Sequence, residues 1–190
     1  GLKPAVGLSE LFTRIAQRLL SYLTMHLPQG DLYPVDMRLR PSGSQGALVT
    51  TVENFEAYHE RGAQLWERQA LVRSRTVAGP RALRERVDAA IHRAAYGSGR
   101  PEEARARIHE MRMKMKRERS PSRMRGDAEW LDLKLGDGGL VEVEFLVQCL
   151  LLLHGHERAA IRTTSTVEAL GRLAQHGLLP QRDAKRVTAA

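Results

Sequence analysis

The first 30 residues carry an amphipathic helical pattern. Apolar side chains recur at spacings of three and four between positions 8 and 23, which places them on one face of a helix. The run Pro28-Gln29-Gly30 interrupts the pattern, and proline and glycine are residues at which helices end. The sequence therefore predicts a helix that begins near residue 8 and ends before residue 30.

The pattern changes to a period of two between residues 32 and 40. Four apolar side chains alternate there with four that are charged or proline: Tyr33, Val35, Met37 and Leu39 against Pro34, Asp36, Arg38 and Arg40. Alternation of this kind is typical of a strand with one apolar and one charged face. It predicts a strand over 32–40, a loop over 41–46 and a short second strand over 47–50.

Most of the remaining sequence has helical patterning. Two capping boxes, Thr50 with Glu53 and Ser165 with Glu168, mark helix starts. Further helices are predicted over about 65–76, 82–95 and 102–119, from 140 onwards, and from Pro180. A short strand over 130–135 and a glycine turn at 136–139 precede the helix at 140. The predicted fold class is α+β and predominantly α-helical, with a few short antiparallel strands followed by a helical bundle.

Composition limits the class of protein further. The chain has 190 residues with 42% hydrophobic content, enough for one globular domain. A single cysteine, Cys149, excludes a disulfide scaffold and favours a cytoplasmic compartment. The longest apolar run, 140–153, is interrupted by Glu142 and Glu144 and is shorter than the ~20 residues of a membrane span. We therefore expect no membrane segment.

The positive charge is concentrated in one region. The net charge is +8, and residues 100–125 contain ten Lys and Arg against four Asp and Glu. Such a run is commonly a solvated helix face, and a contact with a partner protein or an acidic neighbouring domain is the sharper alternative. Aromatic side chains, on which the bases of single-stranded nucleic acid stack, are absent from it. Nucleic acid is therefore a disfavoured partner.

The charged face of the predicted strand is the main candidate site. In a strand, Asp36, Arg38 and Arg40 point the same way at intervals of about 6–7 Å. A carboxylate can bind a divalent metal, guanidinium groups bind phosphate, and Gly43 and Gly46 allow close approach of the backbone. The alternative is an exposed ladder of ion pairs with little energetic value.

Three segments resemble one enzyme family. The segment YPVDMRLRPSGSQGALV at 33–49 is similar to the signature V-D-x-R-L-R-P-x-G-x-x-G-x-L-V of glutamine synthetase adenylyltransferases. The segments LWERQALVRSR at 65–75 and DLKLGDGGLVEVEF at 132–145 resemble the same family, in the same order. The resemblance extends over about residues 8–180, and it identifies the chain as a member of the nucleotidyltransferase superfamily.

The resemblance implies an activity and a set of site residues. Enzymes of this family have one half that transfers AMP from Mg-ATP to a tyrosine of glutamine synthetase and another that removes it by phosphorolysis. The chain looks more like the C-terminal, adenylylating half, with glutamine synthetase and the PII signal protein as partners. The implied roles are catalysis and Mg²⁺ binding in a two-metal site for Asp36, nucleotide phosphate binding for Arg38, Arg40, Gly43 and Gly46, and structural support of the site for Lys134 and Glu144.

The resemblance also implies that part of the site is missing. The family motif G-S-x-x-D-x-D supplies two further carboxylates, but residues 1–30 contain no Asp and the chain has no Asp-x-Asp. We therefore expect a partial nucleotidyltransferase domain over 1–79 and a helical domain over 80–190 that is truncated at its C-terminus. Alone, such a fragment is expected to be inactive.

Two alternatives to an enzyme segment remain open. One is a non-catalytic helical interaction module that binds PII or glutamine synthetase, and the other is a nucleic-acid-binding domain that uses residues 100–125. Two further expectations concern the glutamates that follow the glycine turn. Glu144 lies among apolar neighbours and needs a cationic partner, for which Lys134 is the candidate. Glu142 is expected to be exposed at a helix N-terminus, where the helix dipole favours a carboxylate.

Overall fold

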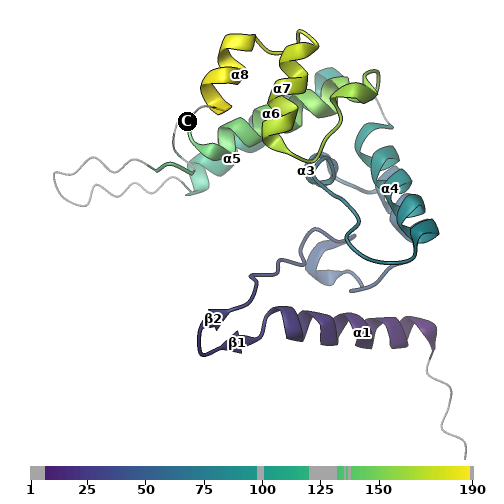
Figure 1. Ribbon diagram of the computed structural model, residues 1–190. Helices are drawn as coiled ribbons and strands as arrows, with labels where there is room; N and C mark the ends of the chain where they lie inside the picture. The colour runs from purple at the N-terminus through teal and green to yellow at the C-terminus, as the bar shows by residue number, and fades with distance from the viewer. Residues whose placement is uncertain (1–6, 98–100, 120–131, 135, 137, 189–190) are drawn as a thin grey trace, which may run out of the picture. The chain divides into compact units, whose positions relative to one another are not determined.

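The structure is a computed structural model that describes residues 7–97, 101–119, 132–134, 136 and 138–188. The chain divides into two compact units, Gly1–Gly62 and Ala63–Ala190, and α-helices dominate the described part of each (Figure 1). The expectation of a predominantly helical fold is therefore confirmed. The division into compact units does not test where functional domains divide, so the boundary after residue 79 stays a prediction.

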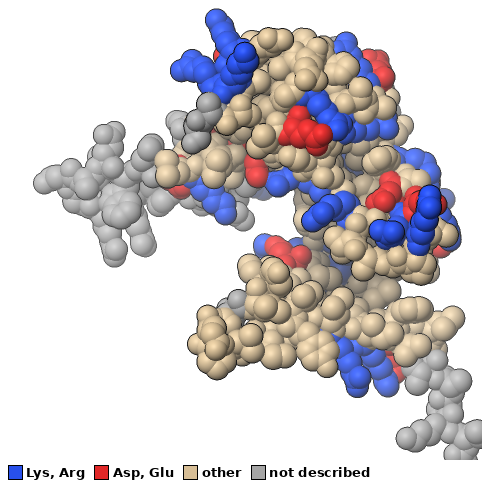
Figure 2. Space-filling model, viewed as in Figure 1, with Lys and Arg blue, Asp and Glu red and all other residues tan. Residues whose placement is uncertain are grey.

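The first unit begins with α1 (Leu8–Leu23), the helix that the apolar spacing predicts. None of its residues is buried, and Leu8, Phe12 and Tyr22 are 74%, 53% and 64% exposed. In Figure 2 the region of α1 is mostly tan, the colour of all residues other than Lys, Arg, Asp and Glu, and shows one small group of blue and red side chains. An apolar stripe of this kind is typical of a helix face that packs against another element.

A short hairpin follows α1. β1 (His26–Leu27) pairs antiparallel with β2 (Gly30–Asp31), and Pro28 and Gln29 form the turn between them. Gly30 has φ = +117°, a conformation that side chains with a Cβ rarely adopt. The helix thus ends at Leu23, several residues before the proline and glycine that were expected to end it, and those two residues shape a turn instead.

The strand predicted over 32–40 is wrong. Residues 33–37 are irregular, Arg38 and Leu39 lie in a turn, and the second predicted strand over 47–50 is not formed either. A strand needs a partner for its main-chain groups, and Pro34 and Pro41 provide no N–H for such pairing. The side chain of Asp36 also accepts a hydrogen bond from a neighbouring main-chain N–H, an interaction that competes with strand pairing.

The helix α2 (Val52–Arg61) completes the first unit. Its cap is Thr51, whose side chain accepts a hydrogen bond from the Asn54 N–H at 3.2 Å, one residue later than the predicted cap at Thr50. The helix ends at Arg61, and Gly62 is its C-cap. The His59 side chain is buried against the rings of Phe55 and Tyr58.

The second unit contains six α-helices and a 3₁₀ turn among its described residues. In chain order they are α3 (Leu65–Leu71), α4 (Arg81–Tyr96), α5 (Pro101–Arg119), α6 (Leu140–His154), η2 (Ala159–Ile161), α7 (Thr166–Gln175) and α8 (Gln181–Thr188). The predicted cap at Ser165 is confirmed, since its side chain accepts from the Glu168 N–H. Of the strand predicted over 130–135, residues 130, 131 and 135 lie outside the described residues. Leu133 and Lys134 form a turn, so no strand is present there.

The core of the second unit is built around α6. Val147 and Leu151 of α6 belong to the same buried cluster as Leu170 and Leu173 of α7, and α8 packs on α7. The ring of Tyr96 lies so close to Gly155 that a Cβ at Gly155 would be 2.6 Å from a ring carbon. Among the described residues, no helix combines the length and apolarity needed to cross a membrane.

Candidate functional site

Asp36 and Arg38 form a closely joined pair in the loop that replaces the predicted strand. The main-chain N–H of Arg38 donates to Asp36 Oδ1 at 2.9 Å, and its guanidinium donates to both carboxylate oxygens, with Nη2 at 2.6 Å from Oδ2. These hydrogen bonds lower the pKa of Asp36 to about 2. The bonds from the guanidinium have the largest effect, and the bond from the main-chain N–H has the next largest. The same contact raises the pKa of Arg38. Asp36 is therefore an anion at neutral pH.

Arg40 has a different environment from Arg38. Its guanidinium donates to three main-chain carbonyl oxygens, those of Met37 at 2.6 Å, Gly46 at 3.1 Å and Ser44 at 3.2 Å. Arg38, by contrast, keeps 75% of its side chain exposed. The two arginines therefore bind different partners: Arg38 binds the Asp36 carboxylate, and Arg40 binds main-chain carbonyl groups. Arg40 stabilises the loop, and its contact with a nucleotide phosphate stays a prediction. Arg38 is exposed, so a ligand can reach it.

The glycines of the loop have structural reasons to be glycine. Gly43 has φ = +57°, and it follows Ser42, which has φ = +62°. A Cβ at Gly46 would lie 1.9 Å from the carbonyl oxygen of Pro41, a distance that no real side chain tolerates. The loop thus folds back on itself at 41–46, and a side chain at Gly46 would prevent this. Whether Gly43 and Gly46 also approach a nucleotide stays a prediction.

The glycine turn before α6 is closed by Glu142. The carboxylate of Glu142 accepts from the Gly138 N–H at 2.9 Å and from Arg112 Nη2 of α5 at 3.1 Å. Glu142 is half-buried rather than exposed, and only 7% of the Arg112 side chain is accessible. The expectation that Glu142 is simply exposed at the helix N-terminus is therefore wrong. Its carboxylate accepts the hydrogen bond of the Gly138 N–H, a donor that an anion bound at the turn would otherwise use.

Glu144 has a cationic partner, but the partner is not Lys134. Arg73, which follows α3, donates to Glu144 Oε1 at 2.7 Å, whereas the Lys134 side chain is exposed. Both members of the Arg73–Glu144 pair are also substantially exposed, so this is a surface ion pair between α6 and the segment after α3. The supporting roles of Lys134 and Glu144 stay predictions.

Sequence reasoning missed two polar contacts that join helices of the second unit. One is Arg112 with Glu142, and the other is the nearly buried Gln69 of α3, which donates to Gln148 of α6 at 2.7 Å. Arg112 stands four residues after the buried Ile108, which places both on the same helix face. That spacing indicates that Arg112 is on the buried face of the helix. It was not recognised because Arg112 is one of ten Lys and Arg residues within 100–125.

The described residues do not by themselves form a metal site. No group of three or more His, Cys, Asp or Glu side chains lies together in the described part of the chain. Asp36 supplies one carboxylate, and both of its oxygens accept hydrogen bonds from Arg38. A Mg²⁺ ion prefers several oxygen ligands in octahedral geometry, which one carboxylate does not provide.

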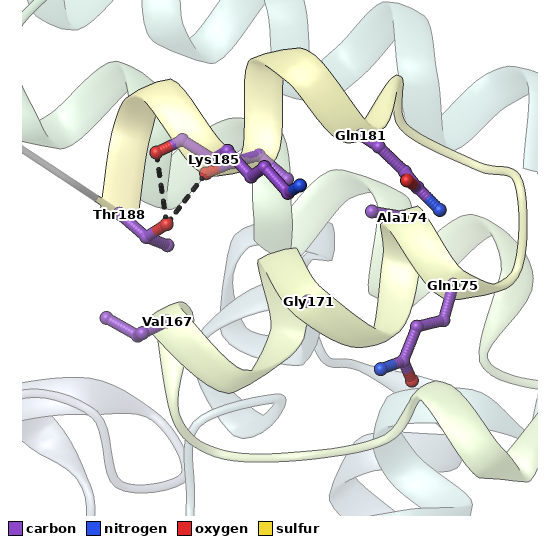
Figure 3. Close-up of a pocket in the computed structure, with 8 residues that line it drawn as sticks. Val167, Gly171, Ala174, Gln175, Gln181, Lys185 and Thr188 are labelled. Atoms are coloured by element: carbon purple, nitrogen blue, oxygen red, sulfur yellow. Dashed lines mark hydrogen bonds between the residues drawn. The ribbon is translucent and has the colours of Figure 1, made fainter.

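A small groove between α7 and α8 contains none of the predicted site residues. It has a volume of about 280 Å³, and Figure 3 shows Gly171 beside α8, with Gln175 and Gln181 toward one end. The hydroxyl of Thr188 donates hydrogen bonds to the carbonyl oxygens of Ala184 and Lys185 in its own helix.

Comparison with known proteins gives the class of this chain. The family model of glutamate-ammonia ligase adenylyltransferase matches residues 5–90, and that of the GlnD PII-uridylyltransferase matches residues 103–190. Both matches are to enzymes named for transferring nucleotides. The first match contains the whole loop from Asp36 to Gly46.

Individual relatives narrow the class to one family. The chain is 37% identical over 180 residues to the bifunctional glutamine synthetase adenylyltransferase/adenylyl-removing enzyme of Rhodopseudomonas palustris (strain TIE-1), covering 93% of this chain and 17% of that protein. The proteins of the same name from Methylococcus capsulatus and Pseudomonas putida are 39% and 37% identical, each over 97% of this chain and over 19% and 20% of their own lengths. The chain belongs to the glutamine synthetase adenylyltransferase family. It spans about a fifth of the length of these relatives.

Proposed function

We propose that this chain forms part of the active site of a glutamine synthetase adenylyltransferase, within the half that attaches AMP. The reaction is attack by a tyrosine hydroxyl of glutamine synthetase on the α-phosphorus of ATP, with release of pyrophosphate. The observation that carries this proposal is the Asp36–Arg38 pair on a loop that glycines and Arg40 shape, inside the segment that matches the family. The names and the 93–97% coverage of this chain by its relatives support it.

Each residue of the loop has a role in the proposal. The guanidinium of Arg38 is bound to the Asp36 carboxylate, but most of the Arg38 side chain is exposed. A phosphate oxygen can therefore compete with the carboxylate for the N–H groups of the guanidinium. Arg40 keeps the loop in shape through the three carbonyl groups that it binds. Phosphoryl-transfer enzymes depend mainly on positioning and charge neutralisation, which a preformed cationic loop supplies.

Asp36 is proposed as one ligand of Mg²⁺, with further ligands from other parts of the longer enzyme. Its low pKa keeps it ionised, as a metal ligand must be. When bound, Mg²⁺ would neutralise charge on the triphosphate and the leaving pyrophosphate. Release of the Asp36 carboxylate from Arg38 would at the same time free the guanidinium for phosphate. We further propose that the PII protein is a regulatory partner and that the enzyme acts in the cytoplasm.

The test uses the longer enzyme that contains this chain. Unmodified glutamine synthetase is incubated with the enzyme, ATP and Mg²⁺, and its intact mass is measured over time. The proposal expects a mass increase of one AMP per modified subunit, lost when the half that contains this chain carries Asp36→Asn. If that half instead transfers the AMP group from adenylylated glutamine synthetase to phosphate and releases ADP, the chain belongs to the removing half and the proposal is wrong.

The interaction module is a second candidate, favoured by one observation. The described part of the second unit is entirely helical apart from turns and loops, and it presents an open groove between α5 and α6. A catalytically silent binding role would leave AMP transfer unaffected by Asp36→Asn. The mass assay therefore separates the two candidates.

A further inference from the structure

An open groove runs between α5 and α6 in the second unit. Its volume is about 680 Å³, and none of the residues that line it belongs to the loop that carries Asp36. The residues that form its floor and rim include Ile108 and Met113 of α5, Phe145, Leu146 and Cys149 of α6, and the cationic Arg105. A groove of this size is in the range of specific binding sites, so its chemistry decides what it can accept.

The floor of the groove is apolar and belongs to α6, a helix that has apolar residues on every side in addition to Glu142, Glu144 and Gln148. Val147 and Leu151 of α6 face the core and are 2% and 1% exposed, whereas Leu146, on the groove side, is 48% exposed. A helix with apolar residues all round is normally covered all round. The groove side of α6 is thus a part of this helix that the described residues leave uncovered.

The α5 side of the groove is positively charged. Arg105 and His109 line it and are exposed, and Arg105 contributes a positive charge there. The one carboxylate among the lining residues, Glu142, is engaged by Arg112 and by the Gly138 N–H. The groove therefore combines an apolar floor with a rim of net positive charge.

We propose that this groove binds an amphipathic helix of a separate partner protein, with an apolar stripe flanked by Asp and Glu. The lining of α5 extends from Arg105 to Met113. These two residues are eight steps of 1.5 Å apart, or about 12 Å, which accommodates about two helical turns. Helices bind apolar grooves through residues at i, i+3, i+4 and i+7. The acidic flanks would meet Arg105.

The charged rim favours a separate molecule over a tethered segment. Complementary charge chiefly raises the rate of encounter between free molecules and excludes wrong partners. A segment of the same polypeptide already has a high effective concentration and gains less from such steering. This proposal does not depend on AMP transfer, because no predicted site residue lines the groove.

The test measures binding of designed peptides to the 190-residue chain by fluorescence anisotropy. One labelled peptide carries Leu at i, i+3, i+4 and i+7 with Glu on both flanks. A second has Lys in place of Glu, and a third has the composition of the first in a scrambled order without an apolar face. The proposal expects binding of the first peptide only, weakened by added salt.

Two pairs of variants locate the binding site. Leu146→Asp places a negative charge on the groove floor and is expected to weaken binding at least about tenfold. Leu83→Asp, at a residue of α4 that is 45% exposed and lies outside the groove, should leave binding unchanged. Arg105→Glu should weaken binding at least about fivefold, and Arg107→Glu on the same helix, which does not line the groove, much less.

Several outcomes would overturn the proposal. One is no binding of the acidic peptide at concentrations up to about 1 mM. Equal binding of the acidic, basic and scrambled peptides would show non-specific adsorption. Equal effects of Arg105→Glu and Arg107→Glu would place the contact elsewhere. A concentration-dependent dimer in sedimentation velocity that Leu146→Asp abolishes would assign the groove to a second copy of the chain instead.

Discussion

Replacing Glu142 by alanine tests whether one carboxylate holds α5, α6 and the glycine turn together. Glu142 accepts hydrogen bonds from Arg112 of α5 and from the Gly138 N–H of the turn. It also lies in the first turn of α6, where the helix dipole favours a negative charge. The substitution removes all three interactions and leaves the nearly buried Arg112 without its contact to this carboxylate.

The expected loss of stability follows from these contacts. Hydrogen bonds to charged groups contribute about 1.5–3 kcal/mol each, and the dipole about 0.3–1 kcal/mol. Because 35% of the Glu142 side chain is exposed, solvent screening reduces the total. We therefore expect Glu142→Ala to lower the free energy of unfolding of the second unit by about 2–3 kcal/mol. For a unit of this size, the melting temperature would fall by about 6–15 °C.

Glu144→Ala is a matched control two residues away on the same helix. It removes the Arg73 ion pair, whose members are 45% and 39% exposed, so a loss of about 0–1 kcal/mol is expected. Thermal unfolding by circular dichroism gives the stability difference between the two variants. Amide hydrogen exchange then shows whether α5 specifically loses protection in Glu142→Ala.

Equal shifts in melting temperature for the two variants would refute this reasoning. Unchanged exchange of the α5 amides in Glu142→Ala would refute it as well, since the carboxylate would then not hold α5 in place.

Three further results are expected. Arg38→Ala should raise the Asp36 pKa from about 2 toward the ordinary value of 3.8, measured by carboxyl carbon NMR. Since the folded pKa is the lowered one, stability from this pair should be present above the unfolded pKa and lost as pH falls toward 2. Gly46→Ala should change the NMR shifts of the amides throughout 37–46, because the new Cβ would meet the Pro41 oxygen. Gly62→Ala should leave those shifts unchanged, since its Cβ would lie 3.7 Å from the nearest atom, the Tyr58 carbonyl oxygen. The 190-residue chain alone should transfer no AMP in the mass assay, since Asp36 belongs to no cluster of metal-binding side chains in the described part of the chain.

The helices were predictable from sequence because their signals are local. The apolar spacing of α1 and the cap at Ser165 each determine a helix from residues within one or two turns. The strand over 32–40 failed because alternation shows only that a strand would be amphipathic. Whether one forms depends on a pairing partner, and here the Asp36 side chain bonds to the Arg38 N–H instead.

The candidate site was predictable in its residues but not in its geometry. The motif at 33–49 led to Asp36, Arg38 and the loop glycines, yet not to the carbonyl groups that Arg40 binds. Partners of Glu142 and Glu144 also escaped prediction. Arg112 and Arg73 are 30 and 71 residues distant in sequence, and only the packing of α3 and α5 on α6 brings them close.

The most direct test compares Asp36→Asn with Glu10→Gln in the longer enzyme. Both carboxylates are 54% exposed and paired with an arginine in the first unit, but only Asp36 is a proposed metal ligand. The measurement is the rate of AMP transfer to glutamine synthetase in the presence of Mg²⁺. The account predicts a loss of at least about 100-fold for Asp36→Asn and less than about twofold for Glu10→Gln. Equal rates for the two variants would contradict the assignment of Asp36 to the active site.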